Sequence, residues 1–307
     1  MKIISYFSYK GGAGRSTLAY NTIPLIARNH LHPTKENPIV IVDMDIDSCG
    51  MSYLLGVKKT DINDDACVQY VLRNGCDPSC PPSISEHATL KKLLPMGNKF
   101  DCEDNEAILF LPAKDIKNVN NDSNYNDTNS QFLTSMRSFV DMCEHYNVSA
   151  VIFDSAVGNQ ATANVSNQIA NVIVCCVKPS IQFVDGTARY LESLDSDDAS
   201  PLGGGRKTIV IVPNVVPQEH IVIDDHAYPD SAINRFFIRL SPIVENRDED
   251  DDITYNLEML DADGFGIPAV KSFMWREAQL ATQKVLYDNE AEVLKKYEKL
   301  AAIIDSI

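Results

Sequence analysis

The sequence predicts an α/β fold, in which a doubly wound, mostly parallel sheet has helices on both faces. Short apolar runs rich in β-branched residues recur along the chain, as is typical of strands that are buried on both sides. They alternate with segments of helical periodicity, and a glycine-rich stretch joins the first run to the first predicted helix. Because we find no internal repeat and no clear linker, we expect a single domain over residues 1–307.

Each expected element follows from local composition and periodicity. The predicted strands are Ile3–Phe7, Ile39–Val42, Ala107–Leu111, Val148–Phe153, Ala170–Val177 and Lys207–Val212, with a last short extended segment at Gly266–Val270. The predicted helices are Thr17–Asn29, Gln131–Tyr146, Ile181–Leu194 and Ala278–Ile304. The segment Ile233–Leu240 fits either a helix or a strand. The alternation over nearly the whole length indicates parallel strands joined by crossover helices.

Three segments lack a clear periodic pattern. Residues 56–104 are rich in Asp and contain the pair Cys76 and Cys80, which could form half of a zinc site. No second Cys or His pair has a matching spacing, so we expect two loop cysteines instead. Residues 115–130 are rich in Asn and Asp and predict a mobile surface loop. Residues 245–252 predict an acidic loop, which is usually solvated; binding of a basic partner is the alternative.

Charge and composition narrow the possible functions. The formal net charge is -16 at pH 7, which disfavours nonspecific DNA binding and anionic membrane surfaces, since both normally require basic patches. The sequence contains no run of about 18 apolar residues, so we expect no membrane-spanning helix. The chain passes at once into a strand-like run and not into a signal peptide, and Cys175 and Cys176 are adjacent in an apolar run, as reduced thiols can be. We therefore expect a cytoplasmic protein.

The glycine-rich loop is the first candidate site. Residues 8–17 read Ser-Tyr-Lys-Gly-Gly-Ala-Gly-Arg-Ser-Thr and connect a predicted strand to a predicted helix. Gly11, Gly12 and Gly14 permit tight turns that present backbone N–H groups to oxyanions, and the helix start adds unpaired N–H donors. Ser16 or Thr17 would place a hydroxyl group on Mg²⁺. The order strand, glycine loop and helix therefore predicts phosphate binding.

This loop departs twice from the standard P-loop pattern G-x-x-x-x-G-K-[ST]. Tyr9 stands at the position of the first glycine, and Arg15 stands at the position of the lysine. That lysine is a compact charge on β- and γ-phosphate oxygens, whereas arginine is bulkier, planar and forked. We expect Arg15 to hold the same oxygens with a different geometry. Nucleotide binding is then expected, but the hydrolysis rate is open, because a misplacement of about 1 Å can cost about 10²-fold in rate.

Carboxylates follow two of the predicted strands. Asp43 and Asp45 come after Ile39–Val42, where they fit either the ligand-binding rim of an α/β sheet or a solvated turn. Beside a phosphate loop, the pattern favours Mg²⁺ and water handling. Asp154 ends the run Val148–Phe153, as a Walker B aspartate does, and the alternative is a helix N-cap. With the loop present, we favour the metal role for Asp154.

Together these residues resemble the ParA/MinD ATPases, whose deviant Walker A loop, KGGxGK[ST], carries a signature lysine before the glycines. Val42–Asp45 is similar to the Walker A′ segment of that family, and Asp154–Gly158 is similar to its Walker B segment. Further similar segments are Ile211–Val216, Ile267–Phe273 and the pair Glu277-Ala278. Their order is right over nearly the whole chain. The arginine places the sequence with a KGGxGR[ST] sub-branch.

The resemblance implies a P-loop NTPase fold with ATP or ADP and Mg²⁺ at the carboxyl edge of the sheet. It implies that Lys10 reaches the phosphates of a partner chain in an ATP-bound homodimer, and that Asp45 orients the attacking water. The implied magnesium residues are Ser16, Asp43 and Asp154. The implied nucleotide-binding residues are Gly11, Gly12, Ala13, Gly14, Arg15, Ser16 and Thr17 in the loop and, facing adenine, Asn214.

The expected function is a slow Mg²⁺-dependent ATPase that forms an ATP-sandwich dimer and acts as a spatial or regulatory switch. The alternative is a nucleotide-dependent dimeric adaptor with little or no hydrolysis, for which Arg15 is the motive. A metabolic ATP-dependent enzyme on the same fold is a weaker third hypothesis. Because of the acidic charge, we expect a protein partner in preference to DNA or a membrane.

Overall fold

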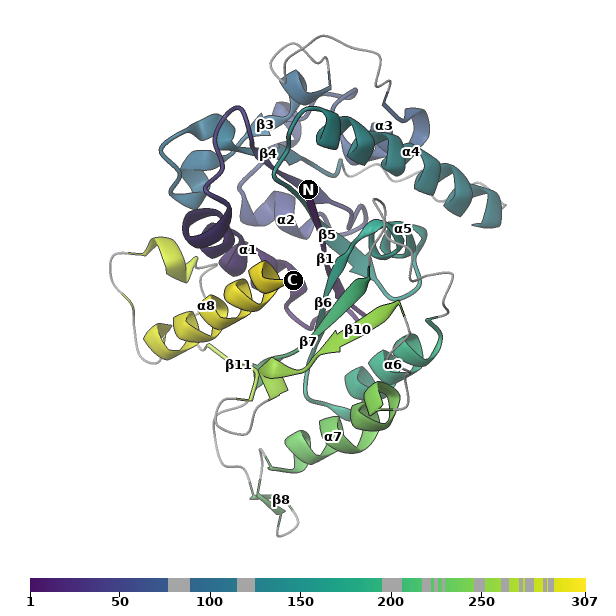
Figure 1. The fold of residues 1–307 in the computed structure, drawn as a ribbon, viewed down its shortest axis with the longest axis vertical. Helices are drawn as coiled ribbons and strands as arrows, with labels where there is room; N and C mark the ends of the chain where they lie inside the picture. Colours follow the sequence, from purple (N-terminus) through teal and green to yellow (C-terminus); the bar gives the residue numbers. More distant parts are fainter. Residues whose placement is uncertain are drawn as a thin grey trace.

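The fold was obtained as a computed structural model (Figure 1). The residues that the structure describes are 1–76, 89–114, 125–194, 206–216, 222–223, 226–227, 230–245, 252–260, 265–270, 273, 279–283, 286 and 290–307.

Nine of the described strands form one sheet, in the order β10-β7-β6-β1-β5-β2-β4-β3, and β11 pairs with β7. Their bounds are β1 Lys2–Ser8, β2 Ile39–Asp43, β3 Leu94–Pro95, β4 Ile108–Leu111, β5 Ala150–Val157, β6 Val172–Val177, β7 Lys207–Val216, β10 Ile253–Asn256 and β11 Ile267–Pro268. Every ladder in this sheet is parallel except β3 with β4. A separate antiparallel pair joins β8 (Val222–Ile223) to β9 (His226–Ala227). The predicted mostly parallel sheet is confirmed.

Helices cover both faces of the sheet, as the sequence predicts; in Figure 1 the sheet runs down the middle of the view, with α1 and α8 to its left and α4, α5 and α6 to its right. The helices on one face are α1 (Arg15–Ile26), α2 (Gly50–Leu54) and α8 (Glu290–Ser306). Those on the other face are α3 (Val68–Asn74), α4 (Tyr125–His145), α5 (Ala161–Ile169), α6 (Ile181–Glu192) and α7 (Asp230–Glu245).

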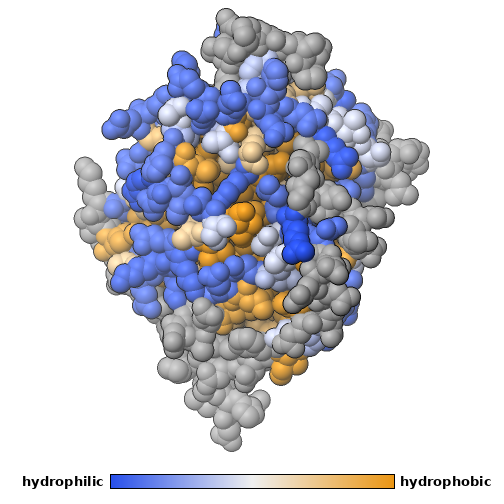
Figure 2. Space-filling model, viewed as in Figure 1, coloured by the Kyte–Doolittle hydropathy of each residue, from blue (hydrophilic) through white to orange (hydrophobic). Residues whose placement is uncertain are grey.

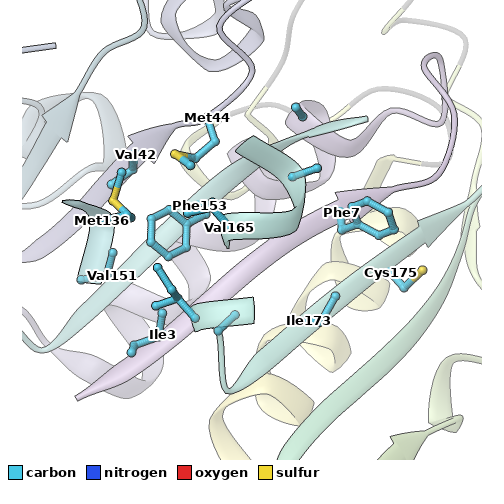
Figure 3. Packing of buried hydrophobic residues seen from close by; sticks show 14 of the residues in the cluster. Ile3, Phe7, Val42, Met44, Met136, Val151, Phe153, Val165, Ile173 and Cys175 are labelled. Atoms are coloured by element: carbon cyan, nitrogen blue, oxygen red, sulfur yellow. The ribbon is translucent and has the colours of Figure 1, made fainter. Parts of the chain in front are cut away.

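Two hydrophobic cores arise from the alternation of side chains along the strands. In β1, Ile3 and Phe7 join the core under α4 and α5, and Ile4 and Tyr6 join the core under α1 and α8. Figure 3 shows the first of these cores, in which Phe153 packs near Val165. Because a strand in the middle of a doubly covered sheet is apolar on both sides, its sequence is a continuous apolar run. On the face drawn in Figure 2, hydrophilic side chains cover much of the upper and left parts, and hydrophobic side chains are visible between them near the middle.

Several boundaries differ from the predictions. Helix α4 begins at Tyr125, so residues 125–130 are helical although we expected them in the mobile loop 115–130; residues 115–124 lie outside the described residues. Strand β7 continues through Pro213 to Val216. The segment Ile233–Leu240 is helical, within α7.

Two further expectations are settled only in part. The last helix begins at Glu290, well after the expected start at Ala278. Of the expected acidic loop 245–252, Glu245 is the last residue of α7 and residues 246–251 lie outside the described residues. Cys80, the second cysteine of the zinc alternative, also lies outside them. In the part of the chain that the structure describes, no helix combines the length and the apolar character needed to cross a bilayer.

The C-terminal segment is tied to α1 at a proline. Pro24 lies inside α1 and has no N–H to donate to the carbonyl of Tyr20, four residues earlier. The Gln279 side chain donates to this carbonyl (Nε2–O 3.0 Å), and the Leu280 N–H donates to the Asn21 side chain (2.9 Å). Gln279 therefore satisfies a backbone acceptor that the proline leaves free. These contacts anchor the helix that begins at the glycine-rich loop.

Candidate functional site

The glycine-rich loop lies at the carboxyl end of the central strand. Strand β1 ends at Ser8, and α1 begins at Arg15, so the loop occupies residues 9–14. Gly12 (φ 86°) and Gly14 (φ 80°) have left-handed backbone conformations that favour glycine. A Cβ atom on Gly14 would also lie only 2.8 Å from Nδ2 of Asn214. The loop conformation thus depends on glycine at these two positions.

Two side chains from strands β6 and β7 donate hydrogen bonds to the loop backbone. Asn214 of β7 donates to the carbonyl oxygen of Ala13 (2.8 Å), and the Cys176 thiol of β6 donates to the same oxygen (3.2 Å). Both side chains are buried. Asn214 Nδ2 is thereby committed to the loop, so at this position Asn214 orients Ala13 and Gly14; its predicted contact with adenine remains a prediction. The sequence predicted Cys176 only as a core thiol, and its hydrogen bond to the loop was not expected.

The two residues that precede the glycines contact α6. The Tyr9 ring packs over Gly186, where an added Cβ would lie 2.3 Å from the Tyr9 ring. This packing explains why an aromatic residue can replace the usual glycine. The Lys10 ammonium lies 3.5 Å from Oε1 of Gln182, close to the start of α6. Within a single chain, then, the Lys10 ammonium lies at the first turn of α6, and its predicted role across a dimer remains a prediction.

Three carboxylates converge beside the loop. Asp43 is the last residue of β2 and is aligned with Asp154 of β5, and Asp45 follows two residues later. All three are buried, with exposed fractions of 0% for Asp43, 6% for Asp45 and 0% for Asp154. The alternatives of a solvated turn and of a helix N-cap are therefore wrong. The strand continues beyond Asp154 to Val157, and the N-cap of α5 is Gln160.

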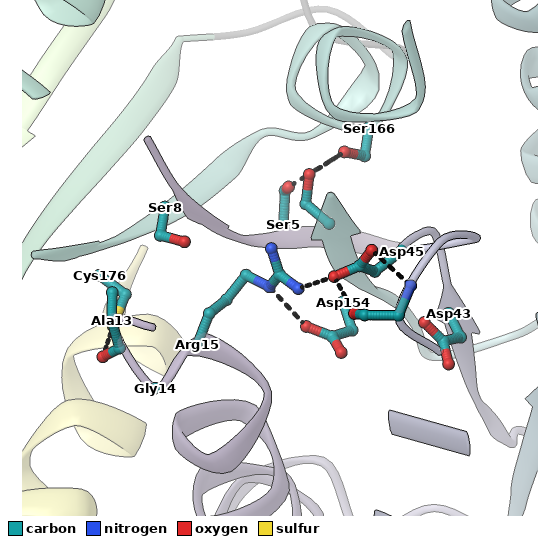
Figure 4. Close-up of polar contacts among 12 residues, drawn as sticks. Ser5, Ser8, Ala13, Gly14, Arg15, Asp43, Asp45, Asp154, Ser166 and Cys176 are labelled. Atoms are coloured by element: carbon teal, nitrogen blue, oxygen red, sulfur yellow. Dashed lines mark hydrogen bonds and ion pairs between the residues drawn. The ribbon is translucent and has the colours of Figure 1, made fainter. Parts of the chain in front are cut away.

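Arg15 bridges two of these carboxylates (Figure 4). Its Nη2 lies 2.6 Å from Oδ2 of Asp45, and its Nε lies 2.9 Å from Oδ1 of Asp154. The guanidinium is only 6% exposed, and its third nitrogen, Nη1, is buried without a hydrogen-bond partner among the described residues. Burial alone would lower the pKa of Arg15, but the charges of Asp154 and Asp45 raise it, so the group stays charged.

Two serines complete the environment of the carboxylates. Ser52 donates to Oδ2 of Asp43 through its backbone N–H (2.9 Å) and its hydroxyl (2.7 Å). Ser48 donates its hydroxyl to Oδ2 of Asp45 (2.6 Å). Burial, reinforced by the charge of Asp154, raises the pKa of Asp43 above its ordinary value. Burial also raises the pKa of Asp154, although Arg15 opposes this effect. No pattern in the sequence predicted that Ser48 and Ser52 would contact these carboxylates.

The oxygen atoms near Ser16 fit a magnesium ion. A Cβ on Gly50 would lie 2.7 Å from Oγ of Ser16 and 3.7 Å from Oδ2 of Asp154, so a space beside these two oxygens depends on the glycine. Asp154 Oδ2 and Asp43 Oδ1 are buried and lack hydrogen-bond partners in the described part of the chain. Hydroxyl and carboxylate oxygens are the hard ligands that Mg²⁺ prefers.

The described residues would supply only part of the coordination shell of a metal ion at this place. The described residues contain no group of three or more His, Cys, Asp or Glu side chains that could hold a metal ion alone. Mg²⁺ often keeps several water ligands and binds through one or two protein groups together with substrate phosphates. The arrangement of Ser16 and Asp154 beside a glycine-rich loop suits that kind of shared site.

The sheet and the loop together define the class of fold. A mostly parallel sheet whose central strand leads through a glycine-rich loop into a helix is the P-loop NTPase architecture. Sequence comparison adds nothing to this, since no protein-family model and no curated protein matches the chain. Solved structures do match, over nearly the whole length.

The matching structures include McdA, MinD and ParA family proteins. An ATP complex of a single-residue McdA variant from Cyanothece aligns with a TM-score of 0.63 and 13% identity over 100% of this chain and 97% of that one. The septum site-determining protein MinD from Pyrococcus horikoshii, with Mg-ADP, gives 0.55 and 16% over 99% and 96%. A ParA family ATPase from Chlorobium tepidum gives 0.57 and 12%, over 98% of both chains. The chain has the fold of these ATPases.

Proposed function

We propose that the chain is a nucleotide-binding ATPase of the ParA/MinD family, in the branch whose loop reads KGGxGR[ST]. The observation that carries the proposal is the convergence of the loop, Ser16, Asp45 and Asp154 at the carboxyl edge of the sheet. Ligands of open α/β sheets bind at this edge, where the strand order reverses. The shared fold with ATPases solved in complex with ATP or Mg-ADP supports the same conclusion.

Each residue of the site has a role in this proposal. The backbone N–H groups of residues 11–17 bind the phosphate chain at the start of α1. Ser16, Asp43 and Asp154 would hold Mg²⁺, which would neutralise charge on the phosphates. Asp45 orients the attacking water. Lys10 reaches the phosphates of a second copy of the chain, so that ATP favours a sandwich dimer and hydrolysis releases it.

Measurement of single-turnover hydrolysis in Asp45→Ala tests the catalytic assignment. We expect the rate to fall at least about tenfold while ATP binding persists, because removing a water-orienting group leaves the phosphate contacts in place. The matched control is Asp47→Ala, an exposed aspartate of the same turn. If Asp45→Ala hydrolyses ATP at the wild-type rate, the role of Asp45 is refuted.

A second function, a nucleotide-dependent dimeric adaptor with little hydrolysis, has one observation in its favour. Arg15 engages both Asp45 and Asp154, the two carboxylates that hydrolysis would use. If the contact persists after ATP binds, neither carboxylate can perform its role. Wild-type protein that keeps bound ATP intact for many hours, with Mg²⁺ present, would establish the adaptor and exclude the slow ATPase.

The dimer is tested separately, by light scattering with and without Mg²⁺·ATP. We expect the molar mass to double on addition of ATP, and we expect Lys10→Ala to remain monomeric while it still binds ATP. The control is Lys91→Ala, an exposed lysine in another part of the chain. A Lys10→Ala variant that dimerises like the wild type would contradict the role across the interface. The acidic charge favours a protein as the further partner.

A further inference from the structure

Arg15 replaces the usual phosphate-binding lysine, but its contacts in the structure are with carboxylates. Two of its three guanidinium nitrogens are used by carboxylates from separate places in the fold, one after β2 and one in β5. The charged groups are almost completely buried, so solvent screens their attraction little. Two carboxylates, Asp45 and Asp154, share the positive charge of this one guanidinium. Arg15 is therefore the counter-ion of the nucleotide-free site.

A divalent cation at this site would need the same carboxylate. Asp154 Oδ1 accepts from Arg15, and Asp154 Oδ2 faces the space beside Ser16. A cation on Oδ2 would lie close to the positively charged guanidinium. Two positive charges that lie close together in a buried site repel each other strongly. The guanidinium and the metal ion thus compete for Asp154 unless Arg15 moves.

Phosphate oxygens offer Arg15 an alternative partner. Guanidinium groups bind phosphates in bidentate fashion, and Nη1 of Arg15 is buried without a hydrogen-bond partner in the described residues. The side chain begins at the first residue of α1, where the proposed nucleotide phosphates would lie. A phosphate chain that draws the guanidinium toward itself would release Asp154 for the metal and Asp45 for water.

We propose that Arg15 is a latch that excludes a divalent cation from Asp154 until a nucleotide phosphate displaces it. The inference depends on the proposed function for the identity of the displacing ligand, but not for the exclusion itself. A lysine at this position would not form the same latch. Its single ammonium on a flexible stem lacks the planar fork that reaches both Asp45 and Asp154.

Binding of Mn²⁺ in the absence of nucleotide tests the latch directly. Free Mn²⁺ is counted by electron paramagnetic resonance as it is titrated against wild-type protein, Arg15→Lys and the control Arg73→Lys, which alters an exposed arginine of α3. We expect wild type and Arg73→Lys to bind Mn²⁺ weakly. We expect Arg15→Lys to bind it at least tenfold more tightly. Equal affinity in all three proteins would overturn the latch.

A second measurement on the wild-type protein keeps the inference testable if Arg15→Lys does not fold. The Nε–H signal of Arg15, observed by ¹⁵N nuclear magnetic resonance, should exchange slowly in the nucleotide-free protein because Asp154 accepts from it in a buried site. Addition of Mg²⁺·ATP should shift this signal. A signal that exchanges freely without nucleotide, or that does not change when ATP is bound, would contradict the latch.

These two tests also separate the latch from the proposed function. The Mn²⁺ titration contains no nucleotide, so a gain in affinity in Arg15→Lys supports the exclusion step even if the wild type fails to bind ATP. In that case the proposed function fails alone. If instead ATP binds but Mn²⁺ affinity is independent of Arg15, the latch fails and the nucleotide site stands.

Discussion

Two buried cations, one at the amino ends and one at the carboxyl ends of the parallel strands, differ in how fully their N–H groups are hydrogen-bonded. Lys207, the first residue of β7, is 1% exposed and donates to the carbonyl oxygens of Asn167 (2.9 Å) and Gln168 (3.4 Å) near the C-terminus of α5. Arg15, at the carboxyl edge, has two carboxylate partners but an unpartnered Nη1 among the described residues. The ammonium pairs with a helix end that carries partial negative charge, whereas the guanidinium faces oxygens that also suit a metal.

This difference indicates which site is built for a ligand. Lys207 lines a cavity of about 640 Å³ beside α4, α5 and α6, but its ammonium is already bonded to the protein, and we assign it a structural role. Around Arg15, three buried polar atoms lack partners among the described residues: Arg15 Nη1, Asp43 Oδ1 and Asp154 Oδ2. Buried polar atoms without partners are costly unless something else satisfies them. Three such atoms lie at the carboxyl edge, whereas one, Asn129 Oδ1, lies at the cavity of Lys207, so the comparison favours the carboxyl edge as the proposed ligand site.

The largest effect on stability should come from Arg15→Ala. It leaves Asp45 and Asp154 buried without the cation that both of them contact, and breaking a buried pair in this way typically costs about 3–5 kcal/mol. Urea denaturation of the nucleotide-free protein measures the free energy of unfolding. The control Arg73→Ala, on the exposed face of α3, should change it by less than about 0.5 kcal/mol. Similar values for both variants would mean that Arg15 is not the counter-ion of the site.

A smaller loss of stability should follow Lys207→Met. The thioether side chain keeps the packing of the stem but leaves the carbonyl oxygens of Asn167 and Gln168 without this donor, at a cost of about 1–3 kcal/mol. ATP affinity should not change. Reduced ATP affinity in a Lys207→Met protein that remains folded would break the comparison between a structural and a functional cation.

The variant Asp43→Asn should stabilise the nucleotide-free protein as the pH rises. The folded-state pKa of Asp43 lies above the unfolded value of about 3.9, so the folded state binds the proton more tightly. Its contribution to stability is present below the unfolded pKa and is lost as the pH rises through the folded pKa. Asparagine does not titrate and still accepts from Ser52.

We therefore expect Asp43→Asn to exceed the wild type by about 1–2 kcal/mol at pH 8 in the presence of a chelator, with a smaller difference at pH 5. Urea denaturation at the two pH values gives both numbers. The exposed neighbour Asp47→Asn serves as the control. A difference that does not depend on pH would show that the carboxyl group of Asp43 ionises normally.

The smallest and most selective change should be Gly50→Ala. The added methyl group would lie 2.7 Å from Oγ of Ser16, so it fills part of the space proposed for the metal. We expect nucleotide binding in the presence of Mn²⁺ to weaken about tenfold, or about 1.4 kcal/mol. Binding with a chelator should be unaffected, and calorimetry compares the two conditions. Equal weakening in both would place the metal elsewhere.

The fold was largely predictable because its strands are short, doubly buried apolar runs. The runs at Ile39–Val42 and Val148–Phe153 each became a strand in the expected parallel sheet. Boundaries were less predictable, as at the start of α4, because helix propensity is only a weak guide to where a helix begins. The end of β7 was missed because Pro213 suggested a stop, although proline is tolerated where its missing N–H is not needed.

The residues of the candidate site were predicted from the sequence, but the ion pairs between them were not. The loop and the three aspartates were expected at one place because they follow strand-like runs, and parallel strands place their carboxyl ends at one edge. The contacts of Arg15 could not be derived from that pattern, since its partners lie 30 and 139 residues away in sequence. The arginine at the position of the usual lysine was the one unusual feature of the loop, and the sequence analysis interpreted it only as a phosphate ligand.

The central claim, that the glycine-rich loop binds a nucleotide, is tested most directly by calorimetric titration of the wild-type protein with Mg²⁺·ATP. The account predicts one ATP per chain, with weaker binding when the metal is removed. It also predicts no binding in Gly14→Ala, because the methyl group would collide with Asn214 at a backbone conformation that disfavours alanine. Absence of binding by the folded wild type, or unchanged binding by Gly14→Ala, would contradict it.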